Sequence, residues 1–151
     1  MTGVQTCALP IYTSLRMAFD AKEDKQIVLL YGLIDGRVPE SRLAEAAEFI
    51  SRANFGLLVG NFEMDWADGE IRFKVSVDVE GGELTPTMIR NMTNYCVVTV
   101  NRYYPSLMGV LFGNLDPAEA ATAAEEAEDG DDHVHGDDCD HGPHGGGDDL
   151  A

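Results

Sequence analysis

The chain has 151 residues, a length typical of one domain with short attachments. It holds 27 acidic and 10 basic residues, for a net charge of −17, and 13 of the acids but none of the bases follow Gly113. A chain this acidic is repelled by nucleic acid and by anionic membrane surfaces, so neither is expected as a partner. No stretch reaches the roughly 18 apolar residues of a membrane span, and the scattered cysteines do not make a disulfide framework. We therefore expect a cytoplasmic protein.

The first residues show no helical or strand period. Residues 1–11 resemble, codon by codon, the translation of a common short-read sequencing adapter, and Tyr12 agrees with the one base left over. We therefore predict that residues 1–12 are an adapter-derived, disordered leader, and we exclude them, with Cys7, from the fold. The alternative is a native disordered leader.

Residues 14–34 predict an antiparallel hairpin. Leu15, Met17 and Phe19 alternate with polar residues, which is typical of a half-buried strand. The charged residues 21–25 form the expected turn. The apolar run 26–34 is bounded by turn residues and indicates a well-buried strand.

The next segment predicts a helix. Pro39 suits the first helical turn, where its missing N–H costs nothing, and Glu40 places negative charge near the positive end of the helix dipole. Apolar residues then recur at helical spacing. The helix is expected to stop at residues 54–56, with Gly56 as a left-handed cap.

A second hairpin is predicted over residues 58–80, because Asp68-Gly69 separates two alternating runs. A two-residue turn there fixes a register that matches apolar with apolar side chains on one face and acid with base on the other. The expected opposite pairs are Trp66–Ile71, Met64–Phe73, Phe62–Val75, Asp65–Arg72 and Glu63–Lys74.

The last predicted element is a helix over residues 86–103. Thr85 is the expected N-cap, and Pro86 occupies the first helical position. Pro105 predicts a kink or an end, followed by a short apolar turn. The element order β-β-α-β-β-α indicates an α+β domain over residues 13–113, with an antiparallel sheet and helices on one face.

Five segments of the sequence together resemble a known family, and they are Arg52–Leu57, Gly60–Asp65, Asp68–Arg72, Leu84–Thr85 and Arg102–Pro105. The family is YbjN, whose members are described as bacterial sensory-transduction regulators. The resemblance implies a fold similar to that of type III secretion chaperones, and it defines no catalytic residues. It also implies a first helix before residue 13, where the adapter-like segment stands, so we expect an N-terminally truncated domain.

Residues 114–151 are predicted to be an acidic, His-, Asp- and Gly-rich disordered tail. Imidazole and thiolate are good ligands for zinc and nickel, although the spacing matches no zinc finger. The competing interpretation is a solvated tail with no metal role. The candidate metal ligands are His133, His135, Cys139, His141 and His144.

The body of the chain offers little for catalysis. Residues 13–113 contain no histidine, the usual general base and the usual partner of a nucleophile. Glu63 and Asp65 lie two apart on one strand, but a salt-bridged surface is favoured over an acid–base pair. Cys96 is favoured as a buried structural residue. The sequence therefore predicts no enzyme and no resident cofactor.

Two functions remain. The first is a non-enzymatic regulator or chaperone-like module that binds a protein through a sheet face, a sheet edge or a helix-lined groove, and the sequence does not name the partner. The alternative is a metal-buffering or metal-delivery protein that acts through the His-rich tail. An open sheet edge could also pair with itself in a homodimer.

Overall fold

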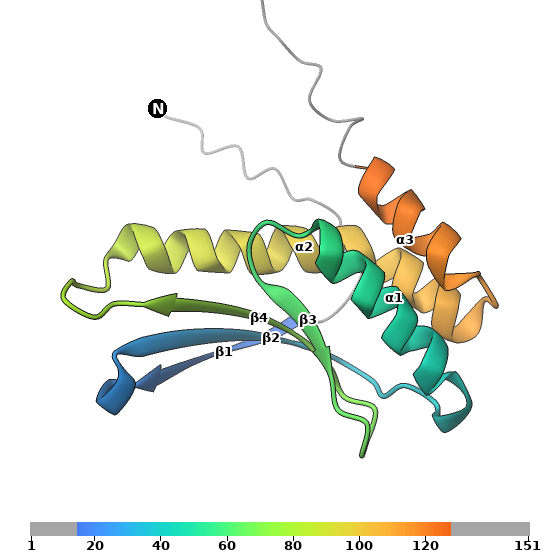
Figure 1. Cartoon of the computed structure of the whole chain (residues 1–151), viewed down its shortest axis with the longest axis horizontal. Helices are drawn as coiled ribbons and strands as arrows, with labels where there is room; N and C mark the ends of the chain where they lie inside the picture. Colours follow the sequence, from blue (N-terminus) through green and yellow to red (C-terminus); the bar gives the residue numbers. More distant parts are fainter. Residues whose placement is uncertain (1–14, 128–151) are drawn as a thin grey trace, which may run out of the picture.

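The computed structural model describes residues 15–127, in which helices cover one face of an antiparallel sheet (Figure 1). The strands are arranged in the order β1-β2-β4-β3. This confirms the predicted α+β class and the order β-β-α-β-β-α, to which one more helix is added. The strands are β1 (Leu15–Lys22), β2 (Ile27–Ile34), β3 (Asn61–Met64) and β4 (Ile71–Asp78). The helices are α1 (Leu43–Gly56), α2 (Pro86–Phe112) and α3 (Pro117–Glu126), with short 3-10 turns η1 (Glu23–Lys25) and η2 (Glu40–Arg42).

The β1–β2 hairpin forms as predicted, with η1 as its turn. Gln26 closes the turn in the left-handed conformation, at φ 52°. Along β2, alternate side chains point under the helices, and Val28, Leu30 and Ile34 are buried there. Strand β1 is less buried than predicted, because α2 packs over β2 and β4 and leaves β1 at the margin of the sheet.

The end of α1 differs from the prediction. Gly56 is the last helical residue, but it is not left-handed. Instead, the Asn54 side chain fixes the chain that follows: its Oδ1 accepts from the N–H of Phe62 at 2.8 Å, and its Nδ2 donates to the Phe62 carbonyl at 2.9 Å. One amide side chain thereby satisfies both backbone groups of a residue in the edge strand β3 and ties α1 to the sheet.

Replacing Asn54 should therefore loosen the α1–β3 connection. We expect Asn54→Ala to lower the free energy of unfolding by about 1–3 kcal/mol, the cost of leaving partly buried polar groups unpaired. Chemical denaturation measures the change. Asn94→Ala, at an exposed position in α2, is the matched control and should be neutral or slightly stabilising because alanine has the higher helix propensity. Equal losses in both variants would contradict the role of Asn54.

The β3–β4 hairpin forms, but the predicted register is wrong by two residues. Phe62 lies opposite Phe73, and Met64 lies opposite Ile71. The turn is longer than two residues because the Gly69 N–H donates to the Asp65 carbonyl at 2.8 Å. Asp65 and Asp68 further stabilise it, since their carboxylates accept from the N–H groups two residues on. A shift of two keeps the paired side chains of β3 and β4 on their predicted faces, whereas Trp66 falls in the turn.

Helix α2 begins as predicted, with the Thr85 hydroxyl accepting from the Met88 N–H at 3.2 Å. It does not end or break at Pro105, and it continues to Phe112. The buried face continues across the proline, with Tyr103 before it and Leu107 after it, so packing of the helix on the sheet outweighs the lost backbone hydrogen bond.

The predicted tail starts too early. Residues 117–126 form α3, with Asp116 as its N-cap and Pro117 at its first position. The helix packs on α1 and α2 through small side chains that are 2–3% exposed, namely Ala120, Ala121 and Ala124. Alanine has the highest helix propensity of the amino acids. The buried alanines provide the apolar contact with the domain, which the acidic composition of this segment did not suggest.

The centre of the core is an aromatic cluster of Phe49, Phe62, Phe73 and Tyr103. It joins α1, β3, β4 and α2, and its rings meet edge to face. The ring centroids of Phe62 lie 5.0 Å from Phe73 and 5.7 Å from Tyr103. Such pairs add about 0.5–1.5 kcal/mol each beyond the burial of their area.

Candidate interaction surface

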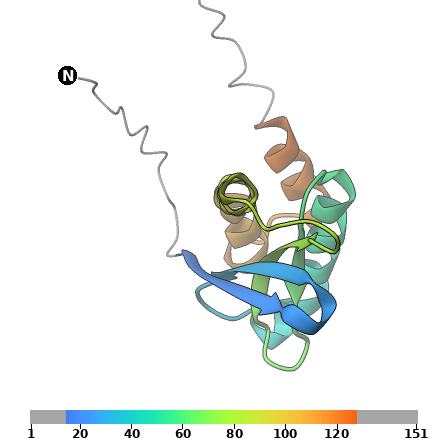
Figure 2. The ribbon, with the colours of Figure 1, turned by 90° about the vertical axis from the view of Figure 1, so that its left-hand side faces the viewer.

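The sheet face opposite the helices is the candidate site, and we call it the outer face. Figure 2 looks along α2 and shows the helices gathered on the other side of the sheet. On β2 the outer face carries an apolar row, which is Ile27, Leu29, Tyr31 and Leu33. These side chains are only half-buried, whereas the alternate ones under the helices are fully buried. Strand β2 is therefore apolar on both faces, a pattern typical of strands that are covered on both.

Charged side chains of the neighbouring strands flank the apolar row. Glu63 on β3 accepts from Arg72 at 2.8 Å and also pairs with Lys74, both on β4. The Arg72 guanidinium lies over the Tyr31 ring, 4.5 Å from its centroid. These contacts hold the arginine flat against the row.

The Glu63 carboxyl of the outer face has a lowered pKa. Partial burial acts to raise its pKa, but hydrogen bonds from Lys74 and Arg72 bring the pKa below the ordinary value of 4.5. A carboxyl whose pKa is lower in the folded state stabilises the fold at pH values above its unfolded-state pKa. That stabilisation is lost as the pH falls through its folded-state pKa.

We expect Glu63→Gln to lower stability by about 1 kcal/mol or less at neutral pH, because the ion pairs are partly exposed. The difference from the wild type should shrink as the pH falls below 4.5 and the wild-type carboxyl gains its proton. Denaturant unfolding at neutral and acidic pH measures both values. Glu83→Gln, in an exposed loop, should leave stability at neutral pH unchanged. A Glu63→Gln deficit that grows with acidity would contradict the sign.

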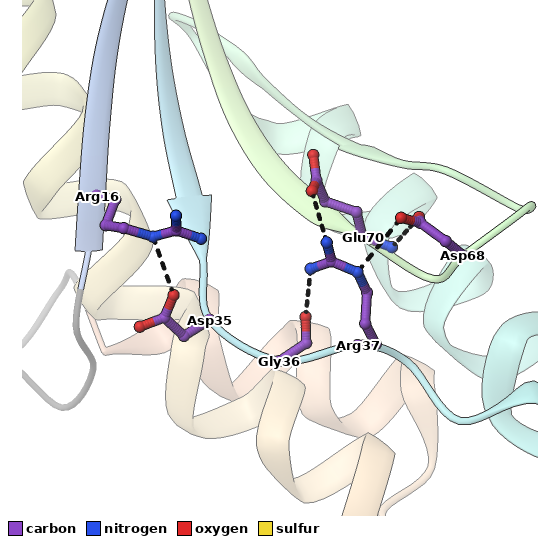
Figure 3. A network of polar contacts seen from close by, with 6 residues as sticks. All are labelled: Arg16, Asp35, Gly36, Arg37, Asp68 and Glu70. Carbon is purple, nitrogen blue, oxygen red and sulfur yellow. Dashed lines mark hydrogen bonds and ion pairs between the residues drawn. The ribbon is translucent and has the colours of Figure 1, made fainter.

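A second polar cluster lies at the end of the sheet, where β2 ends and β4 begins (Figure 3). Arg37 contacts Glu70 at 3.0 Å and Asp68 at 3.4 Å, and it also donates to the Gly36 carbonyl. These pairs are exposed and contribute little to stability individually. Together they hold the segment after β2 against the β3–β4 turn, where the Val38 N–H also donates to the Gly69 carbonyl at 2.9 Å.

The hollow beside this cluster is too small for a substrate. Its volume of about 40 Å³ would hold only a few water molecules. Its lining is mostly apolar and includes Ile34, Val38, Ile71, Leu107 and Leu111.

The residues that were weighed for chemistry have structural partners. Glu63 contacts Arg72 and Lys74, and Asp65, which lines the same hollow, accepts from the N–H of Ala67 at 2.7 Å. Cys96 is buried against Gly32, and burial raises the pKa of its thiol to about 11, so the thiol is protonated at neutral pH. This confirms the interpretation of Cys96 as a buried structural residue.

The predicted metal ligands His133, His135, Cys139, His141 and His144 lie outside the described residues, as does the predicted leader over residues 1–12. Between residues 15 and 127, no group of three or more His, Cys, Asp or Glu side chains is placed to hold a metal ion. The zinc or nickel site therefore stays a prediction. No helix in the same part of the chain is long and apolar enough to cross a membrane.

Sequence reasoning missed two features of the outer face. The apolar run of β2 indicated a buried strand, but it did not show that one face has no helix over it. Trp66 was expected to face Ile71, but it lies in the longer turn and is 61% exposed beside the Glu63–Arg72 pair. The two aspartates that bond to the turn backbone were the available signal for a longer loop.

A scan against protein-family models matches residues 3–108 to YbjN, described as "Putative bacterial sensory transduction regulator". The description is of a regulator and names no enzymatic activity. The range overlaps the predicted adapter segment, whose origin stays a prediction. Searches of the curated proteins and of the solved structures gave no match, so the likeness to secretion chaperones also stays a prediction. Because the matched range covers well over half of the chain, the protein belongs to the YbjN family.

Proposed function

We propose that the protein is a non-enzymatic regulatory module that binds a protein partner through the outer face. The observation that carries the proposal is the apolar row of β2. It lies in the centre of the sheet, and nothing between residues 15 and 127 covers it on the outer side. Apolar area removed from water stabilises a complex by roughly 25 cal/mol per Å², so binding of a partner over this row is favourable.

The surrounding charges indicate the kind of partner. The outer face carries the basic residues Arg16, Lys22, Arg72 and Lys74 and the acidic residues Asp20, Glu63 and Asp78. The strands of this face thus carry one more base than acid, in a chain of net charge −17, and the acids Asp65 and Glu70 lie beside them at the β3–β4 turn. The occupant that fits is an amphipathic protein segment whose apolar side chains cover the β2 row and whose flanks carry acidic residues.

Site-specific photo-crosslinking tests the surface directly. A benzophenone amino acid is placed at Tyr31, in the centre of the row, and at Thr122, on the exposed side of α3, as the matched control. Both proteins are irradiated in lysate of the source bacterium. We expect a discrete crosslinked protein from position 31 that is absent from position 122.

The crosslink should disappear when Leu29→Glu is added, because a charge then lies in the row. It should persist when Leu58→Glu is added, since Leu58 is 94% exposed in the loop between α1 and β3. It should also persist in a protein that ends at Ala127, which keeps α3 and removes the predicted metal ligands. Equal crosslinking at positions 31 and 122, or a product unaffected by Leu29→Glu, would overturn the proposal.

A further inference from the structure

The free edge of β1 carries a self-complementary pattern. Strand β1 ends the sheet order, and among residues 15–127 only β2 pairs with it. On the helix side of this edge, Met17 and Phe19 are 44% and 49% exposed, although both continue the apolar face of β2. An exposed strand edge with apolar side chains is a template for pairing with another strand.

The hydrogen-bond phase of the sheet shows which backbone groups of β1 face outward. The Val79 N–H donates to the Gln26 carbonyl, and the Asp65 N–H donates to the Glu70 carbonyl, both at 2.9 Å. In an antiparallel sheet, the backbone groups of alternate residues point to opposite neighbouring strands. When this alternation is followed from these two bonds through β4 and β2, the odd-numbered residues of β1 direct their N–H and C=O groups to the open edge. Met17 and Phe19 therefore each offer one donor and one acceptor there.

We propose that a second copy of the chain pairs with this edge, β1 against β1 in antiparallel order, around a two-fold axis at Ala18. Met17 then exchanges hydrogen bonds with the partner's Phe19, and the reverse pair forms on the other side of the axis. On the outer face, Arg16 lies opposite the partner's Asp20, again twice, and each side chain shares this contact with its exposed intrachain partner, Asp35 at 3.2 Å or Lys22 at 2.7 Å. One register thus matches apolar with apolar and base with acid.

Neighbouring registers do not have this match. A shift of the pairing by two residues in one direction places Arg16 opposite the partner's Lys22, and a shift in the other direction places it opposite the partner's Ala18. A shift by one residue would put apolar side chains on the wrong face and lose the hydrogen-bond phase. Charge complementarity therefore selects both the occupant and the register.

The helices leave room for the partner. Helix α2 packs over β2 and β4, so the two copies of α2 would be separated by four strand spacings, about 19 Å. This exceeds the diameter of a helix with its side chains, about 10–12 Å. The product is a continuous eight-stranded sheet whose two outer faces lie side by side.

Charge reversal tests the register in the full chain. Arg16→Asp places two Asp–Asp pairs across the two-fold axis, and Asp20→Arg places two Arg–Arg pairs there. Sedimentation velocity at physiological salt should find the wild type at twice the mass of one chain and each single variant at the mass of one chain. An equimolar mixture of the two variants should recover the dimer, because every cross-axis pair is then Asp–Arg or Arg–Asp.

Arg90→Asp, at an exposed position in α2, carries the same change of charge as Arg16→Asp and should remain dimeric. Thermal melts check that each variant is folded. A wild type that stays monomeric at every concentration reached would overturn the proposal. So would a dimer that survives both reversals, or folded variants whose mixture stays monomeric. None of these results depends on a protein partner, so the outcome is separable from that of the proposed function.

Discussion

Phe73→Ala should lower the free energy of unfolding by about 3–5 kcal/mol, the range for removing a large aromatic side chain from a packed core. The Phe73 side chain is fully buried in β4 and forms one side of the aromatic cluster. Its loss removes the contact with Phe62 and leaves a cavity between α2 and the sheet. For a domain of this size, the melting temperature should fall by more than about 10 °C.

The matched control is Phe55→Ala. Phe55 is 96% exposed at the end of α1, so the same chemical change should alter stability by no more than about 0.5 kcal/mol. Denaturant titrations of the two variants and the wild type give the comparison. Similar losses at both positions would mean that the aromatic cluster is not the centre of the core.

Gly60→Ala should cost about 2–4 kcal/mol for two separate reasons. Gly60 lies at φ +78°, where a residue with a side chain is strained by about 1–2 kcal/mol. In addition, a Cβ at this position would lie 2.5 Å from the Phe73 Cζ and 2.9 Å from the Lys74 carbonyl oxygen. Because one neighbour is backbone and the other is locked in the core, relief requires movement of the chain before β3.

Gly81→Ala separates the two contributions. Gly81 has a similar φ of +70°, but a Cβ there would meet nothing within 4 Å. Its replacement should therefore cost only the conformational strain, about 1–2 kcal/mol. The difference between the two variants in denaturant unfolding measures the steric cost at Gly60. A Gly81→Ala loss as large as that of Gly60→Ala would contradict the close packing of Gly60 against Phe73.

Local sequence patterns predicted most elements of the fold, because period, turn residues and caps act over a few positions. They failed where tertiary packing outweighed a local signal. Pro105 favours a kink or an end by its own chemistry, yet the apolar face on both sides of it lets α2 continue through it. The alanines of α3 looked like part of an acidic tail, because their burial depends on α1 and α2.

The candidate site was less predictable than the fold. A run such as that of β2 reports the apolar character of a strand, but only the arrangement of helices shows which of its faces remains open. The Glu63–Lys74 contact was predicted, whereas the pairing of Glu63 with Arg72 and of Arg72 with Tyr31 depends on a register that the turn sets. The position of β1 at the sheet margin likewise follows from strand order, which short-range patterns do not determine.

The strand order also bears on how the protein reaches this structure. The two hairpins are local, but the central ladder joins Ile27 to Asp78 and Leu33 to Arg72, across α1 and β3. Closing so long a loop costs chain entropy before the hydrogen bonds of the ladder can form and compensate for it. The pairing of β2 with β4 should therefore limit the rate of folding. Changes in that ladder are then expected to slow folding, while changes at the β1 margin chiefly hasten unfolding.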